Sequence, residues 1–401
     1  MNKIKILLYA LLIFILLAWN NKIVPKRLEI SEIETVRVLG LDNNSEDVMM
    51  TIIRENESSE DSSEGEQSGN SKQEVVSIIS SNFSKAVKAL QNYKSKSFAG
   101  GHVKYIIIGE DMAKNNFVDA IEFVAREVEL RLTAQMYIAR EMTANEIISS
   151  EGSSKEKMAD VLNNLNKNIN AFGISKKQEV LDVLELIVNK KKCDLIPTLM
   201  TADKNIYNKE WEIKSTEETE AESTIEFAGY GIIKGAKLID YLSLEESRGA
   251  NFVNNSLDST VITLGREEAK DISLDLISSD TEIKFLFDEE ELMKIKVINK
   301  NRSNITQIVT ENNVLDEELL RYLEQKQAEI IKNEIEMAVN KSQTLNADFL
   351  NFEGQLRLKH PYKYERIKDK WDEIFKEVPI EVSVESRVRR LYDVLDLESE
   401  E

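Results

Sequence analysis

The chain has one strongly apolar segment, at its N-terminus, and the rest is polar and acidic. Ile6–Trp19 runs for fourteen residues without a charge, after Lys3 and Lys5. A basic flank followed by an apolar run is the pattern that addresses a chain to a membrane. About 380 residues follow without a second run of this kind. We therefore expect one folded body that is delivered to a membrane surface and held there.

The length and surroundings of this segment leave more than one fate open. Fourteen helical residues span roughly 21 Å, which is short of the ~30 Å hydrocarbon core and typical of a signal peptide. However, no A-x-A cleavage pattern and no cysteine for lipid attachment follow the run. We expect an uncleaved anchor over residues 1–24, with cleavage or a buried helix as the alternatives. Basic residues flank the segment on both sides, so charge does not fix its orientation.

Charge excludes one class of partner. The chain carries 72 acidic and 52 basic residues, a net charge of −20, so its surface repels nucleic acid phosphates. Anionic lipid heads are repelled as well, so attachment should depend on the apolar segment. The single cysteine, Cys193, excludes an intramolecular disulfide. A hydrophobic fraction of 42% is enough to form real cores without one.

Strands and helices alternate through the first half of the chain. Ile30–Gly40 and Val48–Arg54 predict a hairpin that turns at Asp42–Asn44. Glu55–Ser71 has no aliphatic or aromatic residue and predicts a solvated acidic loop. Periodicity then predicts strands at 103–108 and 132–140, and helices at 84–92, 111–126, 157–168 and 176–189, with Thr143 capping a further short helix and Ser175 with Gln178 forming a capping box.

The second half predicts a sheet covered by one long helix. A hairpin over 224–233 is expected to turn at Gly229–Gly231, and a short helix over 243–248 is expected to end at Gly249. Alternating apolar residues predict an antiparallel meander of four strands, at 261–264, 272–277, 283–287 and 293–298. The longest helix is expected at about 314–342, followed by a helix at 362–375 and a strand at 380–388.

These elements predict an α+β, multidomain fold with mixed sheets and packed helices. We expect an N-terminal α/β region over 25–200, made of subdomains 25–150 and 151–200. A polar linker follows at 201–223, and a C-terminal α+β domain occupies 224–395.

A search for chemistry yields no catalytic, cofactor-binding or metal-binding residues. His102 and His360 have no carboxylate or cysteine at ligand spacing, and Cys193 has no histidine base nearby in the sequence. Gly100–Gly101 precedes a strand rather than the start of a helix, so it does not indicate a dinucleotide site. Acid pairs such as Glu245–Glu246 are uninformative among 72 acids. A glycosidase-type carboxylate pair stays open, because it needs no local spacing.

Several segments together resemble the Ger(x)C family of spore germination proteins, the C subunits of nutrient germinant receptors. Gly101–Asn115 is followed by AREVELRLTAQMYIA at Ala125–Ala139. Phe227–Phe252 resembles the family's hairpin, turn and short helix ending in an E-x-R-G element, here Glu246–Gly249. Lys363–Phe375 (KYERIKDKWDEIF) then precedes the last strand. The likeness extends from about Glu29 to Tyr392 and lies in the order and spacing of these segments.

The resemblance implies a three-domain α+β protein on the outer face of the inner spore membrane. It implies assembly with two integral membrane partners, the A and B subunits, a role in nutrient-triggered germination and no catalytic activity. Family members usually carry a lipobox that ends in cysteine, whereas Ala18 stands at that position here. This departure favours a peptide anchor in place of a lipid.

Three functions are therefore compatible with this sequence. The leading hypothesis is a non-enzymatic germinant receptor subunit, with no cofactor, that works through protein contacts. The second is a membrane-tethered solute-binding protein that captures the nutrient itself, which predicts a concave pocket with convergent polar groups. The third is an anchored hydrolase of the cell wall, which requires a cleft holding two carboxylates.

Overall fold

The computed structural model describes residues 33–55, 73–93, 97–150, 157–169, 173–188, 193–202, 225–257, 259–266, 269–309 and 317–389. The predicted anchor over 1–24 and most of the acidic loop over 55–71 lie outside these ranges. Within them, no helix combines the length and the apolar character needed to cross a bilayer.

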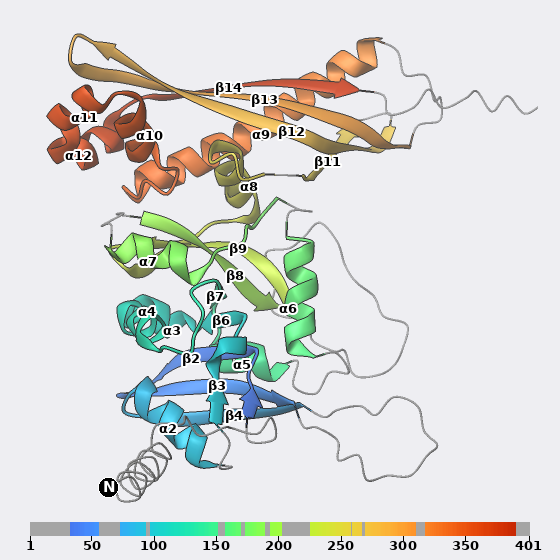
Figure 1. The fold of residues 1–401 in the computed structure, drawn as a ribbon. Helices are drawn as coiled ribbons and strands as arrows, with labels where there is room; N and C mark the ends of the chain where they lie inside the picture. Colours follow the sequence, from blue (N-terminus) through green and yellow to red (C-terminus); the bar gives the residue numbers. More distant parts are fainter. Residues whose placement is uncertain are drawn as a thin grey trace, which may run out of the picture.

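An eight-stranded mixed sheet organises the N-terminal part, and its strand order is β10-β9-β8-β7-β6-β2-β3-β4 (Figure 1). The centre is parallel, and both edges are antiparallel hairpins. The strands are β2 (Val38–Asn44), β3 (Asp47–Glu55), β4 (Gln73–Ser80), β6 (Tyr105–Ile108), β7 (Gln135–Ala139), β8 (Cys193–Thr201), β9 (Ile225–Lys234) and β10 (Lys237–Tyr241). A separate parallel pair joins β1 (Ile33–Thr35) to β5 (Ser97–Ala99).

Helices cover both faces of this sheet, which is why β6 is buried along its whole length. One face packs against α2 (Phe83–Tyr93), α3 (Glu110–Asn115), α4 (Phe117–Arg126) and α7 (Val180–Val188). The other face packs against α5 (Ala144–Ser150) and α6 (Met158–Lys167). A short 3-10 turn, η2 (Gly100–His102), precedes β6.

The C-terminal part is a four-stranded sheet with helices on one face. Its order is β11-β12-β13-β14, from β11 (Val261–Arg266), β12 (Ala269–Asp288), β13 (Glu291–Val309) and β14 (Ile380–Arg389). The first three strands form the predicted antiparallel meander, whereas β14 adds parallel to β13. The helices are α8 (Leu244–Val253), α9 (Glu317–Thr344), α10 (Phe352–Lys359), α11 (Pro361–Ile367), η3 (Lys368–Lys370) and α12 (Trp371–Glu377). The predicted α+β class with mixed sheets and a long covering helix is confirmed.

Several predicted bounds of strands, helices and turns are wrong. The first hairpin turns at Ser45–Glu46 rather than at Asp42–Asn44, so Asp42 stays inside β2 and buried. The helix expected over 111–126 breaks at Asn116, which leaves helical geometry. The helix after Ser175 begins only at Val180, so the Ser175 and Gln178 capping box does not form. The two strands expected at 272–277 and 283–287 are one strand, β12, because the residues between them also pair with β13, past a β-bulge after Leu276.

The hairpin β9–β10 belongs to the large sheet. β9 pairs antiparallel with β8, although the sequence predicts this hairpin as the start of the C-terminal domain. Its turn lies at Gly235–Ala236, where both residues have positive φ, as a two-residue hairpin turn requires. The reason is burial: β8 is buried along its whole length and needs a neighbour on its open edge. The remaining domain boundaries stay predictions.

Candidate functional site

Helix α8 is the junction between the two sheets. It lies between β9 of the large sheet and α9 of the C-terminal part (Figure 1). The apolar core around α8 includes Leu195 of β8 and Tyr230 of β9 together with residues of α9 and β12. The two parts therefore share one hydrophobic core. Since α8 carries the E-x-R-G element, we take this junction as the candidate functional site.

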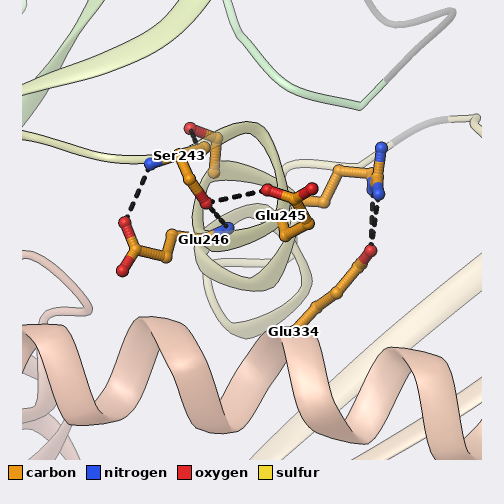
Figure 2. Close-up of polar contacts among 6 residues, drawn as sticks. Ser243, Glu245, Glu246 and Glu334 are labelled. Carbon is orange, nitrogen blue, oxygen red and sulfur yellow. Dashed lines mark hydrogen bonds and ion pairs between the residues drawn. The ribbon is translucent and has the colours of Figure 1, made fainter. Parts of the chain in front are cut away.

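The N-terminus of α8 is closed by a capping box. The Ser243 hydroxyl accepts the N–H of Glu246 at 3.1 Å, and the Ser243 N–H donates to the Glu246 carboxylate at 2.8 Å. Figure 2 shows this pair, with Glu245 accepting a further hydrogen bond from the Ser243 hydroxyl. The box satisfies donors that a helix start otherwise leaves exposed. This fixes where α8 begins, directly after β10.

Two residues of the E-x-R-G element bind α8 to α9. Arg248 donates from Nε and Nη2 to one carboxylate oxygen of Glu334, at 3.0 and 2.6 Å, and Glu334 reaches toward α8 from the helix below it in Figure 2. Both side chains are largely buried. A Cβ on Gly249 would lie 2.0 Å from the Glu334 carbonyl oxygen, so only glycine permits this crossing. The sequence predicted that Gly249 ends the helix. This prediction is wrong, because α8 continues to Val253.

Asn251 joins α8 to the N-terminal part. Its side-chain amide donates to the Gly173 carbonyl at 2.6 Å. Its oxygen accepts the Tyr230 hydroxyl at 2.9 Å and the Ser256 hydroxyl at 2.8 Å. Burial raises the pKa of Tyr230, and the hydrogen bond to Asn251 offsets part of that rise. One amide thus holds β9 and the segment before α7 to the same helix.

The C-terminal end of α8 is bound to β12. The Thr281 hydroxyl donates to the Phe252 carbonyl at 2.7 Å. Asn255 accepts the Thr281 N–H at 2.7 Å and donates to the Thr281 carbonyl at 2.9 Å. In the same region Gly229 has a positive φ of 79° and lies inside β9, where a Cβ would lie 2.6 Å from the Ser247 hydroxyl oxygen. The turn predicted at Gly229 is thus a close approach of β9 to α8.

The two histidines and the cysteine do not lie together in the structure. His102 is exposed in η2, and His360 lies at the start of α11 against the rings of Phe285 and Phe287. Cys193 is a buried thiol in β8 and is not part of a disulfide. In the ranges that the structure describes, no three histidine, cysteine, aspartate or glutamate residues are grouped to hold a metal ion. Asp42 is buried and accepts the N–H groups of Ala144 and Asn145, at 2.8 and 2.9 Å.

Three of the hollows in the described part of the chain have room for a ligand or for side chains of a partner. The largest of these three, about 420 Å³, lies on the outer face of the C-terminal sheet between β12, β13 and β14. A second of about 300 Å³ lies where α8 ends, between β12 and α10, and is lined mainly by carboxamides and by Lys359. A third of about 310 Å³ lies between α2 and α4. Carboxylates line two of them: Asp280 and Glu385 lie in the first, in register on either side of Lys300, and an acidic group from α4 lies in the third.

Sequence reasoning found part of this junction. The E-x-R-G element marked Glu246, Arg248 and Gly249, but it gave Gly249 the wrong role. Asn251 was missed, although a buried polar residue inside an apolar helix face is a local signal of a tertiary hydrogen bond. Glu334 has no local signal, because it is one of 72 acids.

Both parts of the fold match known protein families. Residues 26–201 match the family described as spore germination protein N-terminal domain, and residues 228–392 match the family described as spore germination B3/GerAC like, C-terminal. The two matches together span most of the chain. The first match ends at residue 201, where β8 ends, and the second begins at residue 228, inside β9.

Individual relatives agree with these matches. Spore germination protein KC of Bacillus subtilis (strain 168) is 25% identical over 325 residues, covering 79% of this chain and 78% of that protein. A crystal structure of the GerBC protein superposes with a TM-score of 0.51 at 18% identity, covering 87% of this chain and 96% of that one. At such low identity the structural match shows a shared fold. With its two family domains in order and the E-x-R-G helix joining them, the chain belongs to the Ger(x)C family of spore germination proteins.

Proposed function

We propose that this chain is the non-enzymatic C subunit of a nutrient germinant receptor. In this proposal the N-terminal segment holds it at the outer face of the inner spore membrane, where it assembles with the integral A and B subunits. The observation that carries the proposal is family membership over both halves of the chain. The α8 junction supports it, because two sheets held by one core form a rigid body suited to protein contacts.

Deletion in the native host tests the role. Spores that lack the chain are expected to lose the response to particular nutrients while germinating normally by non-nutrient routes. Normal nutrient germination in a strain without a paralogue contradicts the proposal. A tagged full chain is expected to recover the A and B subunits from spore membranes, and a chain lacking residues 1–24 is expected to appear in the soluble fraction.

One observation favours the second candidate, a tethered solute-binding protein. The 300 Å³ hollow at the end of α8 is lined by Asn254, Asn255, Asn351 and Gln355, whose carboxamides suit a small polar ligand. Calorimetry of the full chain with amino acids and sugars tests this. Saturable heat that disappears in Gln355→Leu supports the solute-binding function, and absence of heat supports a scaffold for the membrane subunits.

A further inference from the structure

The outer face of the C-terminal sheet has no cover in the described part of the chain. Alternate residues of β12 and β13, such as Leu274 and Val297, point to the inner face and are buried with α9. The opposite face carries Val261, Ile277, Leu286 and Met293, each 41–49% exposed. They are spread along the face, since Val261 pairs with Asp275 and Leu286 pairs with Lys294 near the other end of β12, so only Ile277 lies near the middle of the sheet.

A row of cations runs along β13 on this same face. Every second residue of β13 from position 294 to 302 is a cation, except at position 298, which is isoleucine. The cations are Lys294, Lys296, Lys300 and Arg302. Lys294 and Lys296 both bind Glu381 of β14, at 3.0 and 3.6 Å. Lys300 and Arg302 have no carboxylate within 4 Å among the described residues, in a chain whose net charge is −20. Within the described ranges, these two neighbouring cations form no ion pair, although Lys300 faces Asp280 and Glu385 on the adjacent strands.

Strand register adds a repulsion at this point. Arg302 of β13 lies directly opposite Arg387 of β14, and like charges in that position destabilise a sheet. The second like-charged pair on this face, Lys284 opposite Lys296, is relieved because each lysine binds a glutamate. Arg387 binds Glu385 at 3.1 Å, whereas Arg302 has no ion pair with any residue that the structure describes. The repulsion between Arg302 and Arg387 would become an attraction if an anionic group of another molecule lay between the two side chains.

The hollow of about 420 Å³ on the outer face of the C-terminal sheet lies at this position. Its walls include Ser278 and Asp280 of β12, Lys300 and Arg302 of β13, and Arg387 of β14. Lys300 lies opposite Asp280 on one side and Glu385 on the other, so cations and anions alternate around it. The volume of about 420 Å³ admits one or two side chains of a partner.

We propose that this outer face docks a partner polypeptide that inserts an aspartate or glutamate side chain between Lys300 and Arg302. The proposal rests on the proposed function and adds a docking face and the charge of the partner segment. Asp280, Glu282, Glu381 and Glu385 on the same face would be repelled by an anionic membrane, whereas a protein surface can match alternating charges. The exposed side chain of Ile277, next to Ser278 of the hollow, adds an apolar contact that suits a polypeptide better than a small free anion.

Charge reversal tests the docking face. The full-length variant Lys300→Glu with Arg302→Glu is compared with a control of equal charge change, Lys177→Glu with Lys237→Glu, both exposed in the N-terminal part. The docking variant is expected to recover about tenfold less of the A and B subunits from spore membranes, and the control is expected to match the wild type. The single variant Arg302→Glu should melt no lower than the wild type, because it faces Arg387 with an opposite charge.

A second measurement does not depend on the membrane subunits. A fluorescent hexaglutamate peptide is expected to bind the wild-type chain saturably and to lose about tenfold in affinity with the docking variant alone. Equal recovery of the subunits by the docking variant and the wild type overturns the inference and leaves the proposed function intact. If the wild type recovers no subunits, the proposed function fails, and the peptide still decides whether the face binds acidic chains. Reduced binding to phosphatidylglycerol vesicles with unchanged recovery identifies a lipid contact and also overturns the inference.

Discussion

Arg248 and Glu334, 86 residues apart in the chain, form a largely buried ion pair that joins helix α8 to helix α9. Two guanidinium nitrogens donate to one carboxylate oxygen. The pair lies beside Gly249, where the two helix backbones make their closest approach. An ion pair at a crossing of two helices fixes their relative rotation as well as their separation.

Replacing only one residue of the Arg248–Glu334 pair is expected to lower the free energy of unfolding more than replacing both. Arg248→Met or Glu334→Leu alone leaves a buried charge and should destabilise the chain by about 3 kcal/mol, whereas the double variant should lose about 1 kcal/mol or less. Denaturant unfolding of the full chain measures the coupling. The exposed pair Arg321–Glu317 is the control, and its double-mutant cycle should give below about 0.5 kcal/mol. A loss in the double variant equal to the sum of the two single losses would contradict a coupled pair.

Gly249→Ala is expected to separate α8 from α9. The new Cβ would lie 2.0 Å from the Glu334 carbonyl oxygen, which is backbone and cannot rotate away. Overpacking of this kind costs about 1–3 kcal/mol, and the paired helices should move apart. Thermal unfolding measures the loss. Gly101→Ala is the matched control, because its nearest neighbour would lie 3.7 Å away. If both variants melt together, the close crossing is not a constraint on the fold.

Asn251→Leu is expected to loosen the N-terminal part from the C-terminal part. The substitution leaves the Tyr230 hydroxyl and the Gly173 carbonyl buried without this partner, at roughly 1–3 kcal/mol for each group. Tyr230→Phe in the Asn251→Leu background should recover part of the loss, because it removes one of the stranded groups. Hydrogen exchange of β9 and of the segment before α7 is the readout. Protection that stays at the wild-type level in both would refute this role for the amide.

Asp42 is expected to make stability depend on pH. Burial raises its pKa from 3.8 to about 6, against the lowering effect of the N–H groups of Ala144 and Asn145. The folded state therefore holds this proton more tightly than the unfolded state. The resulting stabilisation is complete below pH 3.8 and is lost as pH rises toward 6, by roughly 3 kcal/mol in total.

Comparison of variants isolates this effect. The difference in unfolding free energy between the wild type and Asp42→Asn should fall as pH rises from 4 to 6 and stay constant above 7. Asp47→Asn, on the exposed end of the same hairpin, controls for the loss of one negative charge. A difference that does not change between pH 4 and 6 would show that Asp42 titrates alike in both states.

Period and composition determined the elements and the class of this fold. The all-apolar run at Tyr105–Ile108 marked a strand buried on both faces, and the alternation in Met293–Ile298 marked a strand with one wet face. The stripe of Leu319, Leu323, Ile331 and Ile335 marked the helix that covers the second sheet. These patterns are local, because burial on one side of an element repeats with the period of that element.

Only the tertiary structure decided how the elements join. Gly229 and Gly249 look like a turn and a helix end in the sequence, but each is a glycine because another backbone or side chain comes too close for a Cβ. The hairpin β9–β10 joins the first sheet because the edge of β8 needs a paired strand. The role of Glu334 becomes visible only from its ion pair with Arg248. Such constraints arise between residues far apart in the chain, and no local period records them.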